Sequence, residues 1–276
     1  MELFESHVYK NRRDRLQSKF NTGIALIPGN NESPMNYPAN GYHFRQDSNF
    51  SYFFGLDLAG MAGVVDFDEG KQIIFGNDVD IEDIIWMGPQ PMMKDLGEKV
   101  GITDTRPFGE LEAYLKKATE AGSKVHYLPP YRHDNMILIH KLLGISFEEM
   151  KEKSSIELVK AVVDLRAIKD EHEIRELEKA ADIGYKMHMA AFQMARPGII
   201  EQEICGFMEG IAYQYGTGPS FPIILSIRGE TLHNHYHGNT MQDGDMLVVD
   251  AGAQTNMYYA SDFTRTMPVI VIFNIF

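Results

Sequence analysis

The N-terminal half of the chain alternates short apolar runs with longer stretches in which apolar residues recur every three or four positions. Short runs bounded by turn residues indicate buried strands, and the wider spacing indicates amphipathic helices. The runs predict strands at 23–28, 62–67, 71–76 and 124–128. The spaced stretches predict helices at 108–121 and 133–143, after a first helix at 8–20. This alternation favours an α/β domain with a mixed sheet.

A long helix is predicted from about residue 170 to 195. Asp170 is a suitable N-cap, and Glu173 three residues later completes a capping box. The helix should end before Pro197, because proline lacks the backbone donor that a helix needs. Helical spacing predicts one buried face, which consists of Ile174, Leu177, Ala181, Gly184, His188 and Ala191. On this face His188 is expected to pack against a sheet and not to bind a metal.

Residues 247–249 form a short apolar run that indicates a buried strand. The strand delivers Asp250 at its end, where burial of an unpaired carboxylate is costly. Residues 255–256 supply the corner of a turn, and a returning strand at 258–266 carries Asp262. We therefore predict a hairpin across which Asp250 and Asp262 face each other.

Two carboxylates close together repel unless a proton or a cation lies between them. Hard divalent cations prefer carboxylate oxygens, so Asp250 and Asp262 are candidate metal ligands. The alternative is that both aspartates cap turns or pair with Arg265.

A histidine-rich stretch lies just before this hairpin, at residues 232–237. Its spacing would put His233, His235 and His237 on one side of an extended segment, where they could hold zinc. The alternative is a surface loop without a catalytic role.

Composition limits the class of partner. The formal net charge of −13 argues against nucleic-acid and anionic-membrane partners. The single cysteine, Cys205, rules out an intrachain disulfide and favours a reducing compartment, with the cytoplasm as the simplest location. The first residues lack the basic and apolar regions of a signal peptide, and no apolar run is long enough to span a membrane.

The motif Asp250-Ala-Gly, followed by Ser-Asp262-Phe-Thr-Arg-Thr, resembles the first half of the pita-bread metallopeptidase signature. This resemblance implies that Asp250 and Asp262 are metal ligands for two divalent ions, expected to be manganese. The family also places one histidine beside the substrate. Counting back from Asp243-Gly244-Asp245 favours His233, while the His-Tyr pair makes His235 the alternative.

The N-terminal half resembles the domain that precedes the catalytic domain in aminopeptidase P and prolidase, and the likeness is best at residues 44–55. The expected organisation is a creatinase/prolidase-type α/β domain at 1–167, followed at 168–276 by an incomplete α+β pita-bread domain. Relatives of this type form dimers or tetramers, so a homodimer or homotetramer is expected. Trp86, the only tryptophan, is a candidate for the subunit interface, with core packing as the alternative.

The end of the chain departs from the family. After Val269 the family continues to one histidine and two glutamate ligands, whereas residues 270–276 are short and apolar. We expect a chain truncated after about residue 269 that is inactive by itself. The resemblance implies an Xaa-Pro aminopeptidase, which removes the N-terminal residue preceding proline. The alternatives are a prolidase-type dipeptidase and a catalytically dead binding or assembly module.

Overall fold

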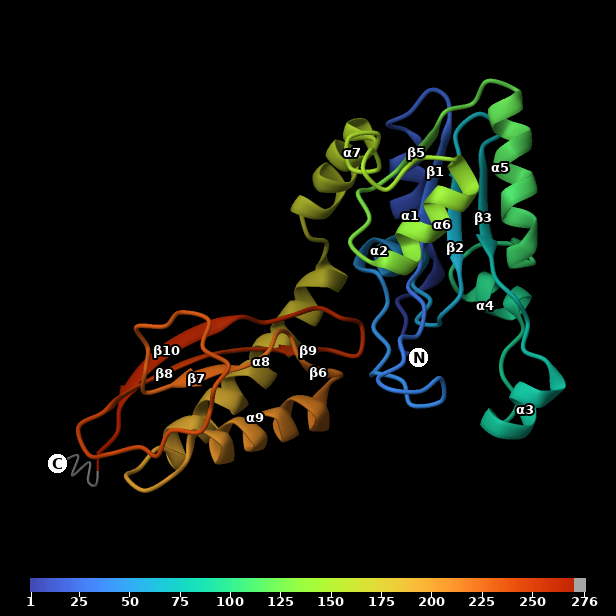
Figure 1. Ribbon diagram of the computed structural model, residues 1–276. Helices are drawn as coiled ribbons and strands as arrows, with labels where there is room; N and C mark the ends of the chain where they lie inside the picture. The colour runs from blue at the N-terminus through green and yellow to red at the C-terminus, as the bar shows by residue number, and fades with distance from the viewer. Residues whose placement is uncertain (271–276) are drawn as a thin grey trace. The chain divides into compact units, whose positions relative to one another are not determined.

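The computed structural model describes residues 1–270, which form two compact units that divide between Ile168 and Lys169 (Figure 1). Unit 1 contains the strands β1 to β5, and unit 2 contains β6 to β10. No helix in the described part of the chain is long and apolar enough to cross a membrane.

Unit 1 is built on a five-stranded sheet with the order β4-β3-β2-β1-β5. Its strands are β1 Ile24–Pro28, β2 Ala62–Asp66, β3 Lys71–Phe75, β4 Asp104–Arg106 and β5 Val125–Tyr127. The central pairs are antiparallel, whereas β3 with β4 and β1 with β5 are parallel. The sheet is therefore mixed, as the alternating sequence pattern predicted.

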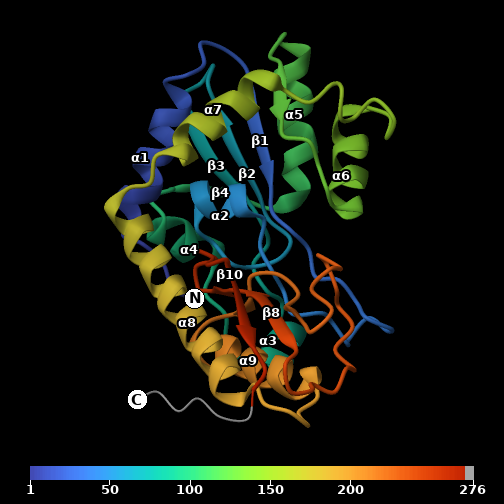
Figure 2. The ribbon, with the colours of Figure 1, turned by 90° about the vertical axis from the view of Figure 1, so that its left-hand side faces the viewer.

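Helices cover both faces of this sheet (Figure 2). The helices of unit 1 are α1 Ser6–Gln17, α2 Ser48–Phe54, α3 Ile81–Met87, α4 Met93–Lys99, the 3-10 turn Phe108–Glu110, α5 Leu111–Glu120, α6 His133–Leu143 and α7 Ile156–Ala167. Of these, α3 buries none of its side chains and does not pack on the sheet. Alternation along β1 separates two cores: Ala25 and Ile27 face α1, α2 and α7, while Ile24 and Leu26 face α5.

The aromatic segment 44–55 belongs to the core of unit 1. Asp47 caps α2 by accepting hydrogen bonds from the backbone N–H groups of Asn49 and Phe50. Phe50, together with Phe53 and Phe54, is fully buried. Trp86 behaves in the opposite way, since it is 81% exposed, and the alternative that it packs in the core is wrong.

Unit 2 packs two helices, α8 Glu171–Met194 and α9 Glu201–Tyr215, against a three-stranded antiparallel sheet of order β10-β8-β7. The strands are β7 Ile224–Ser226, β8 Met246–Ala251 and β10 Phe263–Pro268. A short antiparallel pair, β6 Gly218–Pro219 with β9 Ala253–Gln254, lies beside them. Along β8, the side chains of Leu247, Val249 and Ala251 enter the core beneath the helices. The alternating positions Met246, Val248 and Asp250 therefore point to the other face.

The predicted helix at 170–195 is confirmed, including its capping box, but part of the predicted buried face is wrong. Gly184, His188 and Ala191 are buried, whereas Ile174 is 45% exposed and Leu177 is only half-buried. In the first two turns the inward positions carry charged side chains instead, namely Glu173 and Glu176.

Candidate metal and substrate site

Asp250 lies near the end of β8, the central strand of the three-stranded sheet of unit 2. β8 pairs with β7 on one side, where Asp250 lies opposite Ile224, and with β10 on the other, where it lies opposite Thr264. Because both edges of its backbone are hydrogen-bonded, the position of Asp250 is fixed by the sheet. Its carboxylate oxygen Oδ1 is buried and has no hydrogen-bond partner among residues 1–270.

Asp262 lies immediately before β10 and its side chain is exposed. The expectation that Asp250 and Asp262 lie directly opposite each other is wrong, because Thr264 takes that position. Asp262 is two residues away from Thr264 and is therefore the diagonal neighbour of Asp250. Diagonal neighbours in a regular antiparallel pair are about 7–8 Å apart and share a face.

The turn between the two aspartates explains why the diagonal register arises. After β8 the chain enters β9, which pairs with β6, and then turns at 256–257. A Cβ atom on Gly252 would lie 1.8 Å from the carbonyl oxygen of Ser261. The Ser220 hydroxyl donates to that same oxygen at 2.7 Å, and the Ser220 N–H donates to the Gly252 oxygen at 3.0 Å. Only glycine fits here, so the Asp-Ala-Gly and Ser-Asp motifs are held against each other.

A cavity of about 190 Å³ adjoins Asp250. It is lined by Ile224, Ser226, Gly229, Thr231, Leu232, His233, Val248, Asp250 and Thr264. The structure therefore brings His233 and Asp250 to one cavity, and His235 is not among the lining residues. Sequence reasoning missed Ser226 and Thr264; for Thr264 the strand register was the missing information.

The three clustered histidines do not converge. The ring nitrogen Nδ1 of His237 lies 3.0 Å from the Leu225 carbonyl oxygen, while His233 and His235 are exposed. Within residues 1–270 there is no group of three or more His, Cys, Asp or Glu side chains arranged to hold a metal ion. The interpretation of these histidines as a zinc site is therefore wrong.

His188 supports the strand that carries Asp250 from the core side. Its ring nitrogen Nε2 lies 3.2 Å from the Ala251 carbonyl oxygen, and its ring meets Phe263 edge-on with ring centres 6.3 Å apart. The prediction that His188 packs against the sheet is confirmed.

The donor set suits a hard divalent cation. The unpartnered, buried oxygen of Asp250 is the kind of group that a cation satisfies, and both candidate ligands supply carboxylate oxygens. Arg265 does not neutralise them, since its guanidinium donates to the Thr264 carbonyl oxygen and lies 5.9 Å from the Phe263 ring centre. Among the described residues no ion pair joins Arg265 to either aspartate, so the alternative that they pair with Arg265 is wrong.

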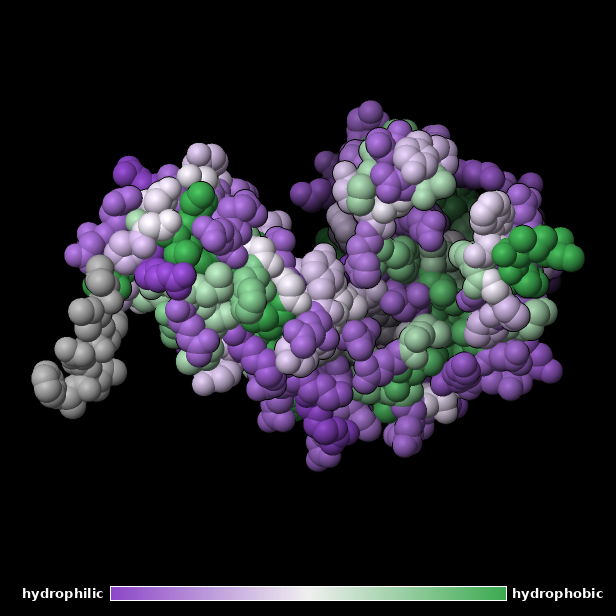
Figure 3. Space-filling view, turned by 90° about the horizontal axis from the view of Figure 1, so that it is seen from below, coloured by the Kyte–Doolittle hydropathy of each residue, from purple (hydrophilic) through white to green (hydrophobic). Residues whose placement is uncertain are grey.

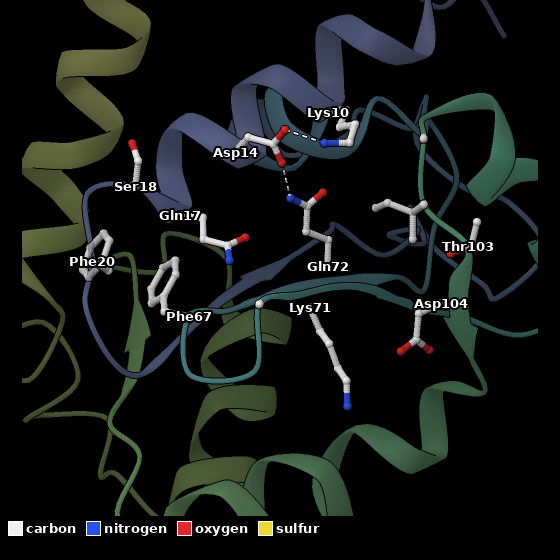
Figure 4. Close-up of a pocket in the computed structure, with 13 residues that line it drawn as sticks. Lys10, Asp14, Gln17, Ser18, Phe20, Phe67, Lys71, Gln72, Thr103 and Asp104 are labelled. Carbon is white, nitrogen blue, oxygen red and sulfur yellow. Dashed lines mark hydrogen bonds and ion pairs between the residues drawn. The ribbon is translucent and has the colours of Figure 1, made fainter.

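Unit 1 has a larger hollow, of about 810 Å³, between α1 and the strands β3 and β4 (Figure 4). Its charged lining residues are already paired. Lys10 lies 2.6 Å from Asp14, which also accepts from Gln72 at 2.8 Å. Lys71 pairs with Glu69, and the carboxylate of Asp104 binds Arg106 through both oxygens. This hollow is larger than the one beside Asp250 but offers no comparable unsatisfied group.

Sequence comparison with known families divides the chain in the same order as its units. Residues 9–127 match the family described as aminopeptidase P, N-terminal domain. Residues 175–272 match metallopeptidase family M24.

Individual relatives agree with these matches. The chain is 27% identical to the Xaa-Pro aminopeptidase of Escherichia coli over 239 residues, which cover 83% of this chain and 54% of that protein. It is 28% identical to a probable Xaa-Pro aminopeptidase of Fusarium vanettenii over 229 residues, which cover 82% of this chain and 48% of that protein. The chain thus spans about half the length of the curated relatives it matches.

Solved structures share the fold. Aminopeptidase PepP of Pseudomonas aeruginosa matches 98% of this chain with a TM-score of 0.83 and 22% identity, over 63% of its own length. Aminopeptidase P of Escherichia coli with the inhibitor Pro-Leu matches 98% of this chain with a TM-score of 0.79 and 24% identity, also over 63% of its own length.

Proposed function

We propose that the chain, which matches the aminopeptidase P N-terminal domain and metallopeptidase family M24 in turn, is of the aminopeptidase P type of pita-bread metallopeptidases and serves in an Xaa-Pro aminopeptidase. The reaction is hydrolysis of the peptide bond between an N-terminal residue and the proline that follows it. The two units would act as an N-terminal domain, 1–167, and the first half of a catalytic domain, 168–276.

In this proposal Asp250 and Asp262 hold two divalent ions, with manganese as the expected metal. Bound divalent ions lower the pKa of water and polarise a carbonyl oxygen, which is the chemistry that peptide hydrolysis requires. The carboxylates supply the negative charge that keeps such ions in place. His233 would lie beside the substrate, where its imidazole would form a hydrogen bond with the reacting peptide group.

One observation carries the proposal: Asp250, whose oxygen Oδ1 is buried and unpartnered, lines the same cavity as His233. A buried carboxylate oxygen without a partner is destabilising by itself. A bound cation accounts for its retention, and the adjoining cavity supplies room for a substrate group.

The test has a binding arm and an activity arm. Manganese titration of the 276-residue chain, followed by electron paramagnetic resonance of the free ion, should show binding that Asp250→Asn removes. Asp243→Asn, which alters an exposed carboxylate before the same strand, is the matched control and should bind as the unaltered chain does. Equal binding by all three proteins would rule out Asp250 as a ligand.

For the activity arm, the complete product of the gene is assayed with manganese on an Xaa-Pro-Xaa tripeptide and on an Xaa-Pro dipeptide. Hydrolysis of the tripeptide is the expected result. Hydrolysis of the dipeptide alone would favour the prolidase-type alternative, and hydrolysis of neither would favour a binding or assembly module.

We also propose that the chain self-associates through α3. This seven-residue helix buries none of its side chains, and Ile81, Ile85 and Trp86 are 77%, 75% and 81% exposed. The green patch at the right-hand side of unit 1 in Figure 3 lies over this helix. Clustered exposed apolar side chains of this kind mark interaction surfaces, and a second copy of the chain is the occupant expected for a homodimer or homotetramer.

Sedimentation velocity tests this surface. Replacement of Ile85 and Trp86 by Ser should convert the oligomer to the monomer, whereas the same changes at the exposed Ile137 and Tyr131 of unit 1 should not. A monomeric unaltered chain would contradict the proposal.

We further propose a cytoplasmic location, which is supported by the free, buried thiol of Cys205.

A further inference from the structure

Glu201, the first residue of α9, is a fully buried carboxylate with an exposed fraction of 0%. All its partners are neutral donors. Oε1 accepts from the Ile227 N–H at 2.7 Å, from the Ser226 hydroxyl at 3.1 Å and from the Asn239 side-chain amide at 3.1 Å. Oε2 accepts from the same Asn239 amide at 3.0 Å.

These donors come from both ends of one loop, residues 226–239, which carries His233 at its middle. The backbone of the same helix end reinforces the contact. The Glu201 N–H donates to the Asn239 carbonyl oxygen at 3.0 Å, and the Gln202 N–H donates to the His237 carbonyl oxygen at 2.9 Å. Ser226 extends the network into the loop, because its oxygen also accepts from the Asn234 amide at 3.2 Å and from the Arg228 N–H at 3.0 Å.

We infer that Glu201 is a positioning residue, whose carboxylate closes the loop 226–239 and so holds His233 at the cavity that Asp250 lines. The inference rests on the proposed function for the role of His233. It assigns to Glu201 no contact with substrate or metal.

A simpler role at the helix end does not explain this arrangement. An acidic side chain near a helix N-terminus is favourable because of the helix dipole, but it gains this while exposed to water. Glu203 in the same turn serves that purpose: it is exposed, and its Oε1 accepts from the Ile200 N–H at 3.2 Å. Burial of a carboxylate is costly unless its lone pairs are filled. Glu201 meets this condition only when both ends of the loop are in place.

The donor pattern also indicates that position 201 must supply an acceptor oxygen. An ionised carboxylate only accepts hydrogen bonds, and it can take several at once. Ile227, Ser226 and Asn239 all present donors to it. A neutral amide at position 201 would keep an acceptor for Ile227 and Ser226, and Asn239 would satisfy the remaining N–H by turning its own amide.

Hydrogen exchange of the 276-residue chain, resolved by mass spectrometry, is the first test. Glu201→Ala should raise exchange in 227–239 at least tenfold and leave the core amides of β8 unchanged. Glu203→Ala, the matched control from the same helical turn, should leave 227–239 within twofold of the unaltered chain. Glu201→Gln should rescue, with exchange within about threefold. If Glu201→Ala does not fold, Asn239→Ala, which removes one donor, should raise exchange in the same segment.

Two results would overturn the inference. One is a folded Glu201→Ala chain whose loop exchange stays within twofold. The other is acceleration spread equally over α8, β8 and the loop, which would indicate general destabilisation.

Kinetics of the complete gene product separate the inference from the proposed function. Glu201→Ala should lower kcat at least tenfold with KM changed less than threefold, and Glu201→Gln should restore it. If His233→Ala impairs hydrolysis but Glu201→Ala does not, the positioning role fails alone. If no variant and no unaltered protein hydrolyses peptides, the proposed function fails, while the exchange result decides whether Glu201 holds the loop.

Discussion

Gly252→Ala tests whether the turn between the aspartates is as tightly closed as the structure shows. The added Cβ would lie 1.8 Å from the Ser261 oxygen, 2.4 Å from the Ser261 carbonyl carbon and 2.7 Å from the Ser220 hydroxyl. An ordinary contact between such atoms needs more than about 3 Å, so one strand must move by more than about 1 Å. The atoms it meets are mainly backbone, which cannot rotate away.

The magnitude follows from what this movement disrupts. Overpacking alone costs about 1–3 kcal/mol. Displacement of Ser220 adds the loss of its two hydrogen bonds to Gly252 and Ser261, each worth about 1 kcal/mol. We therefore expect the free energy of opening of unit 2 to fall by about 3–5 kcal/mol.

Hydrogen exchange of the β8 amides in the 276-residue chain measures that free energy directly. Gly210→Ala is the matched control, because Gly210 lies in α9 and a Cβ there meets nothing within 4 Å. This control should raise the free energy by about 0.5–1 kcal/mol, since alanine is the better helix former. A change of less than about 0.5 kcal/mol for Gly252→Ala would refute the argument that the Asp-Ala-Gly turn requires glycine.

Further outcomes are expected from the same chain. Met187→Ala should cost about 2–5 kcal/mol of unfolding free energy in urea, because Met187 is fully buried, and the half-buried Leu177→Ala should cost less. Burial raises the pKa of the Cys205 thiol to about 11 from the model-compound value of 9.0. The folded thiol should therefore react with a disulfide reagent at pH 8 roughly a hundredfold more slowly than the unfolded one. The contribution of the neutral, buried Cys205 thiol to the free energy of unfolding is complete below pH 9 and is lost as the pH rises towards 11. Urea titrations at pH 9 and at pH 11 would check this. Asp250→Asn and Asp262→Asn should each abolish manganese-dependent hydrolysis by the complete gene product, and near-normal turnover by either would contradict the metal assignment. The 276 residues expressed alone should turn over a proline-containing tripeptide below about a thousandth of an ordinary enzyme's ~10 per second, because two carboxylates hold ions weakly; faster turnover would show that they suffice.

The strands of unit 1 could be predicted because their sequence pattern reflects burial directly. β1 and β2 are runs buried on both faces, and β3 has such a run at its end, in Ile73, Ile74 and Phe75. The predicted range of each strand agrees with the structure within two residues at either end. β4 was missed, because Asp104-Thr-Arg is a short polar edge strand held by pairing with β3. α3 was also missed: it buries no side chain, and its start depends on the local capping box between Asp80 and Asp83.

The buried face of α8 was partly mispredicted because a charged side chain can be buried where residues distant in the sequence supply it with hydrogen-bond partners. Glu173 would be expected in water, yet its carboxylate accepts from the Asp170-capped turn and from the Tyr259 hydroxyl, which donates to Oε1 at 3.1 Å. Tyr259 lies 86 residues away, in the turn between the aspartates. The spacing of apolar residues along a helix gives no information about such a long-range contact. The pattern therefore predicted that Ile174 is buried and did not predict the burial of Glu173.

The candidate site shows the same division between local and long-range information. Asp250 could be predicted as a buried candidate metal ligand because it ends an apolar run. The cost of burying its carboxylate without a partner can be inferred from that strand alone. The register of Asp262 depends on the turn of this hairpin, across which the Ser261 N–H donates to the Ala253 oxygen and Gln254 bridges Ala260, while the other edge of β9 pairs with β6. As a result the two carboxylates differ: Asp250 is held by two neighbouring strands, whereas Asp262 is exposed at the start of an edge strand and is held through Ser261. The close contact between Gly252 and Ser261 therefore keeps the Asp262 carboxylate on the same face of the sheet as that of Asp250.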